Sequence, residues 1–356
     1  MLVGGGSGGA GGGAGSAGGG WRAGKLDLAP EPIPDKYHIV MTSGGGTYSN
    51  WETEICYYWY LKAKDRPGSS MGGFTRLLHA KEDDELSKKI HTIRVDPLGH
   101  PGVGQFPPLA RPLALKMLMD MPDNGITEDY VMMAEPDHIF LDAVPNWASP
   151  TKPAAFPFFY IDFKEKPELV KRWNKQHVPW YMLPPIGNSP AIIHKEQLRE
   201  ILKIWPDLAL EMWEHEPTRA AWGWVLEMYA FAFATTLVDS GLIEFTLRPD
   251  LMLQPPWDKT EMVDRCTPLE IEDCPKRRAF ILHYTYGFDF DETGEFTPGK
   301  IGKAWHFDKR QNQQRRPACS NFLEESLPPG MKEKHPLSWR FAEMMLEACE
   351  AVWGTK

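Results

Sequence analysis

Two carboxylates that directly follow an apolar segment could hold a metal ion. Residues 130–134 are apolar, and Glu135 and Asp137 come next, separated by Pro136. In an extended backbone, side chains two residues apart lie on one face, and ligands of open α/β sheets bind beyond the carboxyl ends of strands. Two acids in such a place suit Mg²⁺ or Mn²⁺ carrying substrate phosphates. A turn whose acids cap the next element is the alternative, and spacing alone does not choose between them.

Imidazole and basic side chains in the C-terminal third could complete such a site. His283 lies near the end of the mostly apolar run 279–284, and imidazole is a good ligand for Mn²⁺. The alternative is a histidine that only forms structural hydrogen bonds. Four basic residues follow in a segment that contains glycines, namely Lys300, Lys303, Lys309 and Arg310. They belong either to a solvated surface or to a lid that closes positive charge over a leaving diphosphate.

Glu227 is the only ionisable residue in the segment 225–234. Burying an unpaired carboxylate is costly, so this side chain needs either a charged partner or a function. A salt bridge to Arg219 or Arg248 is the structural interpretation. A carboxylate that faces a sugar is the functional one.

Two proline-rich turns, residues 184–190 and 253–258, are the remaining motifs. The second contains a Pro-Pro-Trp sequence that ends at Trp257. Such a segment either packs internally or belongs to an aromatic surface that docks a polyproline II ligand.

Short apolar runs alternate with helical patterns, which is typical of a parallel sheet with crossover helices. A capping box is expected at Ser49 and Glu52, at the start of the first helix. Strands are expected at 37–42, 74–78, 130–134, 154–161, 191–193 and 279–284, and further helices at 109–120, 196–205, 218–239 and 338–353. Residues 286–333 are expected to be loops, and the whole is expected to be α/β.

Composition excludes several classes of protein. The chain has 356 residues and a net charge of −9, which argues against nucleic acid as a partner. It contains no run of 18 charge-free apolar residues, so no membrane-spanning helix is expected within it. Residues 4–20 are Gly, Ala and Ser only, and we expect 1–34 to be a disordered linker or stem remnant and 35–356 to be a single domain. A disulfide between Cys266 and Cys274 and two free thiols are both compatible with the sequence.

Nine segments, in order, resemble motifs of the hydroxyproline O-arabinosyltransferases of plants and green algae. They cover roughly residues 37–330. They are residues 57–60, 73–76, 134–138, 155–160, 186–190, 223–229, 254–258, 283–287 and 299–302.

This resemblance implies a GT-A-type, Rossmann-like glycosyltransferase fold with a mostly parallel central sheet flanked by helices. It implies transfer of L-arabinofuranose from UDP-β-L-arabinofuranose to the 4-hydroxyl of hydroxyproline, with retention and with Mn²⁺ or Mg²⁺ as cofactor. Acceptors would be cell-wall glycoproteins of the extensin kind or secreted peptides in polyproline II conformation. The expected location is the Golgi lumen, with membrane contact only through an N-terminal anchor that this sequence does not contain.

The resemblance also assigns roles to residues. It implies a metal site of Glu135, Asp137 and His283, with Asp137 and Glu227 as catalytic residues. The nucleotide and diphosphate would contact Thr42, Ser43, Arg76, Arg111, Lys300 and Lys303. The donor sugar would contact Asn188 and Glu227, and the acceptor Gln254 and Trp257.

Two other functions compete with this one. A related peptidyl transferase would use another UDP-sugar, for example to transfer galactose to serine. Such enzymes usually carry an Asp-x-Asp acid pair, whereas this chain has Glu135-Pro136-Asp137, which favours the arabinosyltransferases. A non-catalytic module that binds polyproline or glycan would not need the acid pair and His283.

Overall fold

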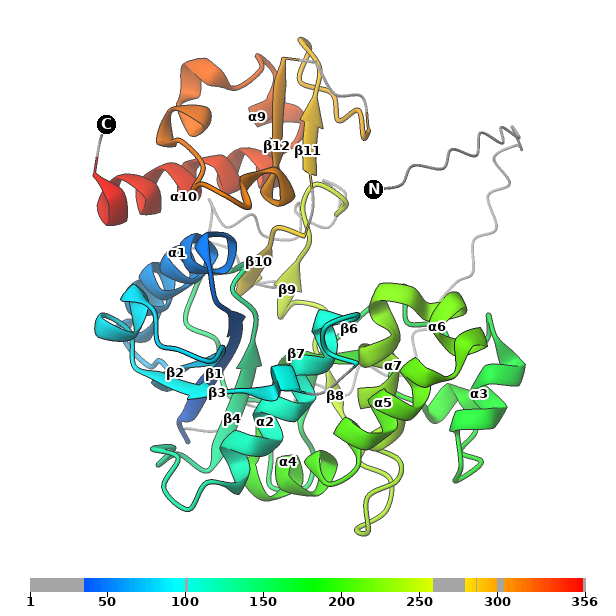
Figure 1. Ribbon diagram of the computed structural model, residues 1–356. Helices are drawn as coiled ribbons and strands as arrows, with labels where there is room; N and C mark the ends of the chain where they lie inside the picture. The colour runs from blue at the N-terminus through cyan, green and yellow to red at the C-terminus, as the bar shows by residue number, and fades with distance from the viewer. Residues whose placement is uncertain (1–34, 100–101, 259–278, 286, 300–303, 355–356) are drawn as a thin grey trace, which may run out of the picture. The chain divides into compact units, whose positions relative to one another are not determined.

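The computed structural model describes residues 35–99, 102–258, 279–285, 287–299 and 304–354 (Figure 1). One compact unit extends from Pro32 to Lys356. The linker predicted over 1–34 lies outside the described residues, as do Cys266, Cys274, Lys300 and Lys303.

A seven-stranded sheet forms the centre of this unit. Its strand order is β3 (Thr92–Val95), β2 (Met71–His79), β1 (Tyr37–Gly44), β4 (Tyr130–Ala134), β7 (Ile186–His194), β6 (Ala154–Pro157) and β8 (Thr246–Leu247). The first four strands are mutually parallel, β7 is antiparallel to both β4 and β6, and β8 is parallel to β6. The strands β1 and β4 lie in the middle of the sheet, and nearly all their side chains are buried. Strands covered on both faces require such largely apolar sequences. The expected α/β class, with a mostly parallel central sheet flanked by helices, is confirmed.

Helices cover both faces of the sheet (Figure 1). The chain passes from β1 through α1 (Thr47–Lys64) to β2 and later from β3 through α2 (Ala110–Asp120) to β4, moving in opposite directions along the sheet. Because such crossovers are right-handed, α1 and α2 lie on opposite faces. The α2 layer also holds α4 (Lys195–Leu202), α5 (Trp205–Glu214) and α7 (Leu226–Ala234), and α1 packs on α10 (Pro336–Trp353). The remaining α-helices of the described ranges are α3 (Pro167–Trp173), α6 (Glu216–Trp222) and α9 (Met331–Lys334).

Two small sheets connect the end of β4 to the C-terminal part of the chain. In the first, β10 (Ile281–His283) lies between β5 (His138–Phe140) and β9 (Met252–Leu253). Its antiparallel register with β5 places His283 directly opposite His138. The second is a hairpin of β11 (Gly287–Phe290) and β12 (Trp305–Asp308). The expectation that 286–333 contains only loops is therefore wrong.

Several expected element boundaries also change. The helix expected over 218–239 is interrupted, because Gly223 takes a positive φ of 47° that ends α6 before the 3₁₀ turn η5 (Gly223–Val225) begins. The helix expected over 196–205 ends at Leu202, the strand expected over 154–161 ends at Pro157, and β7 is longer than 191–193. Other 3₁₀ turns are η1 (Glu85–Lys88), η2 (Pro97–Gly99), η3 (Pro107–Leu109), η4 (Trp180–Met182), η6 (Lys309–Asn312), η7 (Cys319–Phe322) and η8 (Glu324–Ser326).

The capping box expected at Ser49 and Glu52 is wrong as well. The first helix starts earlier, at Thr47, with Gly46 at its N-cap and no side-chain cap. Glu52 therefore lies inside the helix, where its side chain is almost completely buried.

None of the helices in the described ranges combines the length and the apolarity needed to cross a bilayer. A disulfide joins Cys319 in η7 to Cys349 in α10, and Cys56 is a free, buried thiol. This bond ties the chain after β12 to the closing helix.

We expect the Cys319–Cys349 disulfide to stabilise the folded protein by about 3–4 kcal/mol, because it closes a loop with a sequence separation of 30. The double variant Cys319→Ser/Cys349→Ser should then melt about 5 °C below the wild type without reductant. Scanning calorimetry of both proteins, with and without reductant, measures this. Equal melting temperatures without reductant would contradict the expectation, and any shift that reductant still causes in the double variant would come from other cysteines.

Candidate active site

The two predicted carboxylates lie on a tight turn at the end of β4. The N–H of His138 donates to the carbonyl of Glu135 at 3.2 Å, so residues 135–138 fold back. Pro136 favours this turn because its fixed φ suits the second turn position. The extended backbone expected here is therefore wrong, and Glu135 and Asp137 have different partners.

Asp137 is buried between an imidazole and an ammonium group. Its Oδ2 atom lies 3.0 Å from Nε2 of His283 and accepts a hydrogen bond from the ammonium group of Lys309. Burial favours the protonated acid, but His283 and Lys309 outweigh it and hold the pKa of Asp137 well below its ordinary value. Burial lowers the pKa of Lys309, and the nearby carboxylates of Asp137 and Glu52 raise it above its ordinary value. Both groups are therefore charged at neutral pH.

Three side chains of this cluster fit a divalent cation. Asp137, His138 and His283 each offer one ligand atom, and these atoms lie within 4.8 Å of one another. Oδ1 of Asp137, Nε2 of His138 and Nδ1 of His283 are buried and have no hydrogen-bond partner among the described residues. Burial lowers the pKa of His138 to about 3, so its ring is neutral, as a ligand must be. One carboxylate and two imidazoles suit Mn²⁺ better than Mg²⁺, which prefers oxygen ligands.

Glu135 faces a second cluster, which Arg111 organises. The guanidinium group of Arg111 lies 3.2 Å from Glu135 and 3.1 Å from Glu227, and it reaches Oδ1 of Asn188 at 3.5 Å. Glu227 thus pairs with neither Arg219 nor Arg248, because Arg219 donates to the carbonyl of Trp213 and Arg248 pairs with Asp250. Four of the predicted site residues therefore meet here.

Glu227 is the most deeply buried carboxylate of this second cluster, with 1% of its surface exposed. Burial raises its pKa to about 7, although Arg111 lowers it in part. Its Oε1 atom has no hydrogen-bond partner in the described ranges. Gly187 permits this placement, because a Cβ atom there would lie 2.6 Å from the side chain of Met228, the neighbour of Glu227. The glycine lets α7 approach the strand that carries Asn188.

Among the predicted nucleotide residues of β1 and β2, Arg76 is part of the scaffold. Arg76 is completely buried, and its guanidinium group is held by Asp84 at 2.6 Å and by Asn50 at 2.8 Å. No face of it is open to a diphosphate. Thr42 and Ser43 lie at the carboxyl end of β1, where both are buried.

The predicted acceptor residues follow β9. Leu253 pairs with Leu282 in the neighbouring strand, so Gln254 comes next to His283. Gln254 is buried, whereas Trp257 is 49% exposed and borders a cavity of about 280 Å³ that Asp289 and His306 also line. Gln254 thus follows the strand beside one candidate metal ligand, His283.

Three residues outside the predicted site belong to it geometrically, namely Glu52, His138 and Lys309. Oε1 of Glu52 lies 3.9 Å from the ammonium group of Lys309, and burial raises the pKa of Glu52 to about 8. His138 adjoins the predicted acids in the sequence, and Lys309 is among the basic residues expected in a lid. Glu52 gave only a helix-capping signal, so nothing in the sequence marked it for the site.

Comparisons with known proteins identify the same family across the chain. The model of the hydroxyproline O-arabinosyltransferase family N-terminal domain matches residues 37–243, and that of the C-terminal domain matches residues 280–353. Hydroxyproline O-arabinosyltransferase NOD3 of Pisum sativum is 43% identical over 84% of this chain and 82% of its own length. PLENTY of Lotus japonicus is 42% identical, covering 84% and 76%, and hydroxyproline O-arabinosyltransferase 3 of Arabidopsis thaliana is 41% identical, covering 84% and 77%. Among solved structures, galactosyltransferase LgtC with donor and acceptor sugar analogues has a TM-score of 0.40 at 12% identity, covering 77% of this chain and 91% of its own.

The geometry predicts which residues hold a metal ion. His138→Gln, His283→Gln and Asp137→Asn should each weaken Mn²⁺ binding at least about tenfold, because each removes one of three convergent ligand atoms. Glu135→Gln should change the affinity less than threefold, because that carboxylate is engaged by Arg111. Electron paramagnetic resonance of free Mn²⁺ during titration measures the affinities, with circular dichroism to verify folding. Strong loss with Glu135→Gln and none with His138→Gln would support the extended arrangement instead.

The raised pKa of Glu227 predicts a stability that depends on pH. The native state holds the proton of this acid up to about pH 7, whereas the unfolded chain releases it near its ordinary value. Protonated Glu227 therefore contributes to the free energy of unfolding at low pH. This contribution, about 3 kcal/mol in total, is lost as pH rises from about 4.5 to 7.

Glu227→Gln removes this titration. Its free energy of unfolding relative to wild type should rise by about 2–3 kcal/mol between pH 5 and pH 8. Urea denaturation at both pH values measures this, and the exposed Glu168→Gln serves as the matched control. A constant difference between Glu227→Gln and wild type would show that Glu227 has an ordinary pKa.

Proposed function

Because the chain belongs to the hydroxyproline O-arabinosyltransferase family and is a glycosyltransferase, we propose that it transfers L-arabinofuranose from UDP-β-L-arabinofuranose to the 4-hydroxyl of hydroxyproline. One observation carries the proposal. At the turn after β4, the cluster of Asp137, His138 and His283 adjoins the cluster that Arg111 forms with Glu135, Glu227 and Asn188. We assign a cation to the first cluster and a sugar to the second.

The first group binds the diphosphate end of the donor in this proposal. A divalent cation held by Asp137, His138 and His283 would neutralise charge that develops on the departing UDP. Lys309 adds a positive charge at the same carboxylate. In this proposal Lys309 contacts the diphosphate, the role first expected of Lys300 and Lys303, which lie outside the described residues. Thr42 and Ser43 contact the nucleotide.

The second group binds the sugar. Asn188 contacts the sugar hydroxyls, and Arg111 orients Glu227 towards C1. The bond from C1 to the diphosphate oxygen breaks, and the hydroxyproline oxygen bonds to C1 on the face that UDP leaves, which retains the configuration. The proton of the hydroxyl passes to a diphosphate oxygen. Glu227 stabilises the positive charge on the sugar ring or attacks C1 transiently, since its Oε1 atom has no partner among the described residues.

The acceptor approaches past Gln254, which is the predicted acceptor residue next to His283. The acceptor in this proposal is a hydroxyproline-containing polypeptide in polyproline II conformation, which belongs to a cell-wall glycoprotein or a secreted peptide. We further propose the Golgi lumen as the location. The Cys319–Cys349 disulfide supports this, because such bonds persist in oxidising compartments.

The test is mass spectrometry of a synthetic hydroxyproline peptide after incubation with UDP-β-L-arabinofuranose and Mn²⁺. We expect a gain of one pentose per modified hydroxyproline, and no gain when a chelator is present. Asp137→Ala should lower turnover at least about a thousandfold, since it removes charge stabilisation in the transition state. Glu227→Gln should lower it about a hundredfold or more.

Three controls separate the proposal from its competitors. A matched peptide with proline in place of hydroxyproline should gain no mass, because it lacks the acceptor hydroxyl. A panel of UDP-sugars with a serine peptide tests for galactose transfer. Binding of the peptide without any release of UDP would indicate a non-catalytic module, and near-normal turnover of Glu227→Gln would remove that residue from the mechanism.

A further inference from the structure

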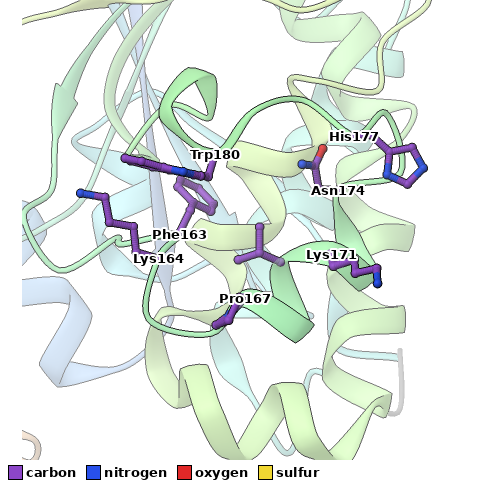
Figure 2. Close-up of a pocket in the computed structure, with 8 residues that line it drawn as sticks. Phe163, Lys164, Pro167, Lys171, Asn174, His177 and Trp180 are labelled. Carbon is purple, nitrogen blue, oxygen red and sulfur yellow. The ribbon is translucent and has the colours of Figure 1, made fainter.

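A groove lined by aromatic and basic side chains lies outside the candidate active site (Figure 2). Its cavity has a volume of about 450 Å³. Phe163, Lys164, Pro167 and Lys171 line it together with Asn174 and Trp180, and we call this set the aromatic groove. The groove is large enough for several residues of an extended peptide, and neither the cation site nor the sugar site uses it.

Large apolar side chains beside the aromatic groove are unusually exposed. Trp180 is 48% exposed, Tyr181 70% and Phe159 80%. The backbone N–H of Phe158 donates to the carbonyl of Pro185 at 2.7 Å, so the segment carrying Phe159 runs next to the one that follows Tyr181. Clustered exposed aromatic side chains of this kind mark binding surfaces in soluble proteins.

The wall of the aromatic groove is held in place before any ligand arrives. The Asn174 side chain accepts the N–H of Val178 at 3.0 Å and donates to its carbonyl at 2.6 Å. Trp173 anchors the same segment by donating to Thr218 at 2.8 Å. His177, between these bonds, takes a positive φ of 51°, a conformation that persists only where its surroundings enforce it. Such a rigid loop lowers the entropic cost of binding.

The charged groups of the aromatic groove are hydrogen-bond donors. Lys164 and Lys171 have no ion pair within the described ranges, Lys164 lies 4.3 Å from the ring of Trp180, and none of the lining residues is acidic. A polyproline II chain presents carbonyl acceptors and pyrrolidine rings, and proline has no backbone N–H to donate. Aromatic rings that flank hydrogen-bond donors are therefore the complement of such a chain.

A short segment joins the aromatic groove to the strand that carries a predicted sugar ligand. Trp180 begins η4, and β7 starts a few residues later at Ile186, two residues before Asn188. The eight steps from Trp180 to Asn188 would span about 29 Å if fully extended, and they span less here because residues 180–182 form a 3₁₀ turn. Nine residues of polyproline II helix span about 28 Å, which is comparable to this separation.

We propose that the aromatic groove docks the flank of the acceptor, as a proline-rich segment in polyproline II conformation several residues from the hydroxyproline that reacts. This inference rests on the proposed function for the identity of the acceptor. It gives the protein a second contact with its substrate, so that long proline-rich chains bind better than short ones.

The test compares two acceptors and four proteins. The acceptors are fluorescently labelled peptides of nine and of three hydroxyprolines. The proteins are wild type, Trp180→Ala, the conservative Trp180→Phe, and Leu61→Ala, which truncates an exposed apolar residue of α1. Fluorescence anisotropy measures the Kd without any reaction, and mass spectrometry measures the KM for transfer.

We expect Trp180→Ala to weaken binding of the nine-residue peptide at least about fivefold and to raise its KM in parallel. The KM of the three-residue peptide should stay within twofold of wild type, Trp180→Phe should restore most of the affinity, and Leu61→Ala should change nothing. Unchanged binding of the long peptide to Trp180→Ala overturns the inference, as does a wild type that does not bind it. A wild type that binds the peptide but adds no pentose overturns the proposed function instead, and the Kd comparison then still decides the role of the groove.

Discussion

The turn from Glu135 to His138 is the constraint on which the candidate site depends. Because the chain folds back at Pro136, the two acids separate, and each recruits a different cation. Arg111 from α2 meets Glu135, while Lys309 and His283 from the C-terminal part meet Asp137. An extended backbone would have put both carboxylates on one face. The turn converts one acidic motif into two adjoining sites of different chemistry.

Burying these charges is costly, and the fold offsets the cost only in part. Among the described residues, the two clusters contain four carboxylates, of Glu52, Glu135, Asp137 and Glu227, but only two permanent cations, Arg111 and Lys309. Each buried ion loses several kcal/mol of hydration, which ion pairing returns incompletely. Burial raises the pKa of Glu52 and of Glu227, and Lys309 and Arg111 counteract this only in part. An excess of acidic groups favours the binding of a divalent cation, and it also stabilises a transition state that carries positive charge.

Local patterns were sufficient for the class of fold and for part of the site. The apolar runs at β1 and β4 predicted buried strands, and the family motifs included Glu135, Asn188 and Glu227. The structure brings these three residues together with Arg111, which the resemblance had assigned to the nucleotide. Patterns failed where distant contacts decide. Arg76 was a plausible diphosphate ligand, but Asp84 and Asn50 surround its guanidinium group. The role of Lys309 depends on its contact with Asp137, which lies 172 residues earlier in the chain. Local sequence patterns cannot predict a contact between residues so far apart.

The candidate cation site is assembled from both ends of the chain. Asp137 and His138 lie in the segment that matches the N-terminal family domain, while His283 and Lys309 lie in the segment that matches the C-terminal one. The pairing of β5 with β10 joins the two segments at this point, where His138 faces His283. The N-terminal segment alone would keep Asp137 without its ammonium partner, and the C-terminal segment alone has no carboxylate to hold His283. The two family domains therefore share one cluster of buried charges, to which each domain contributes part of the groups.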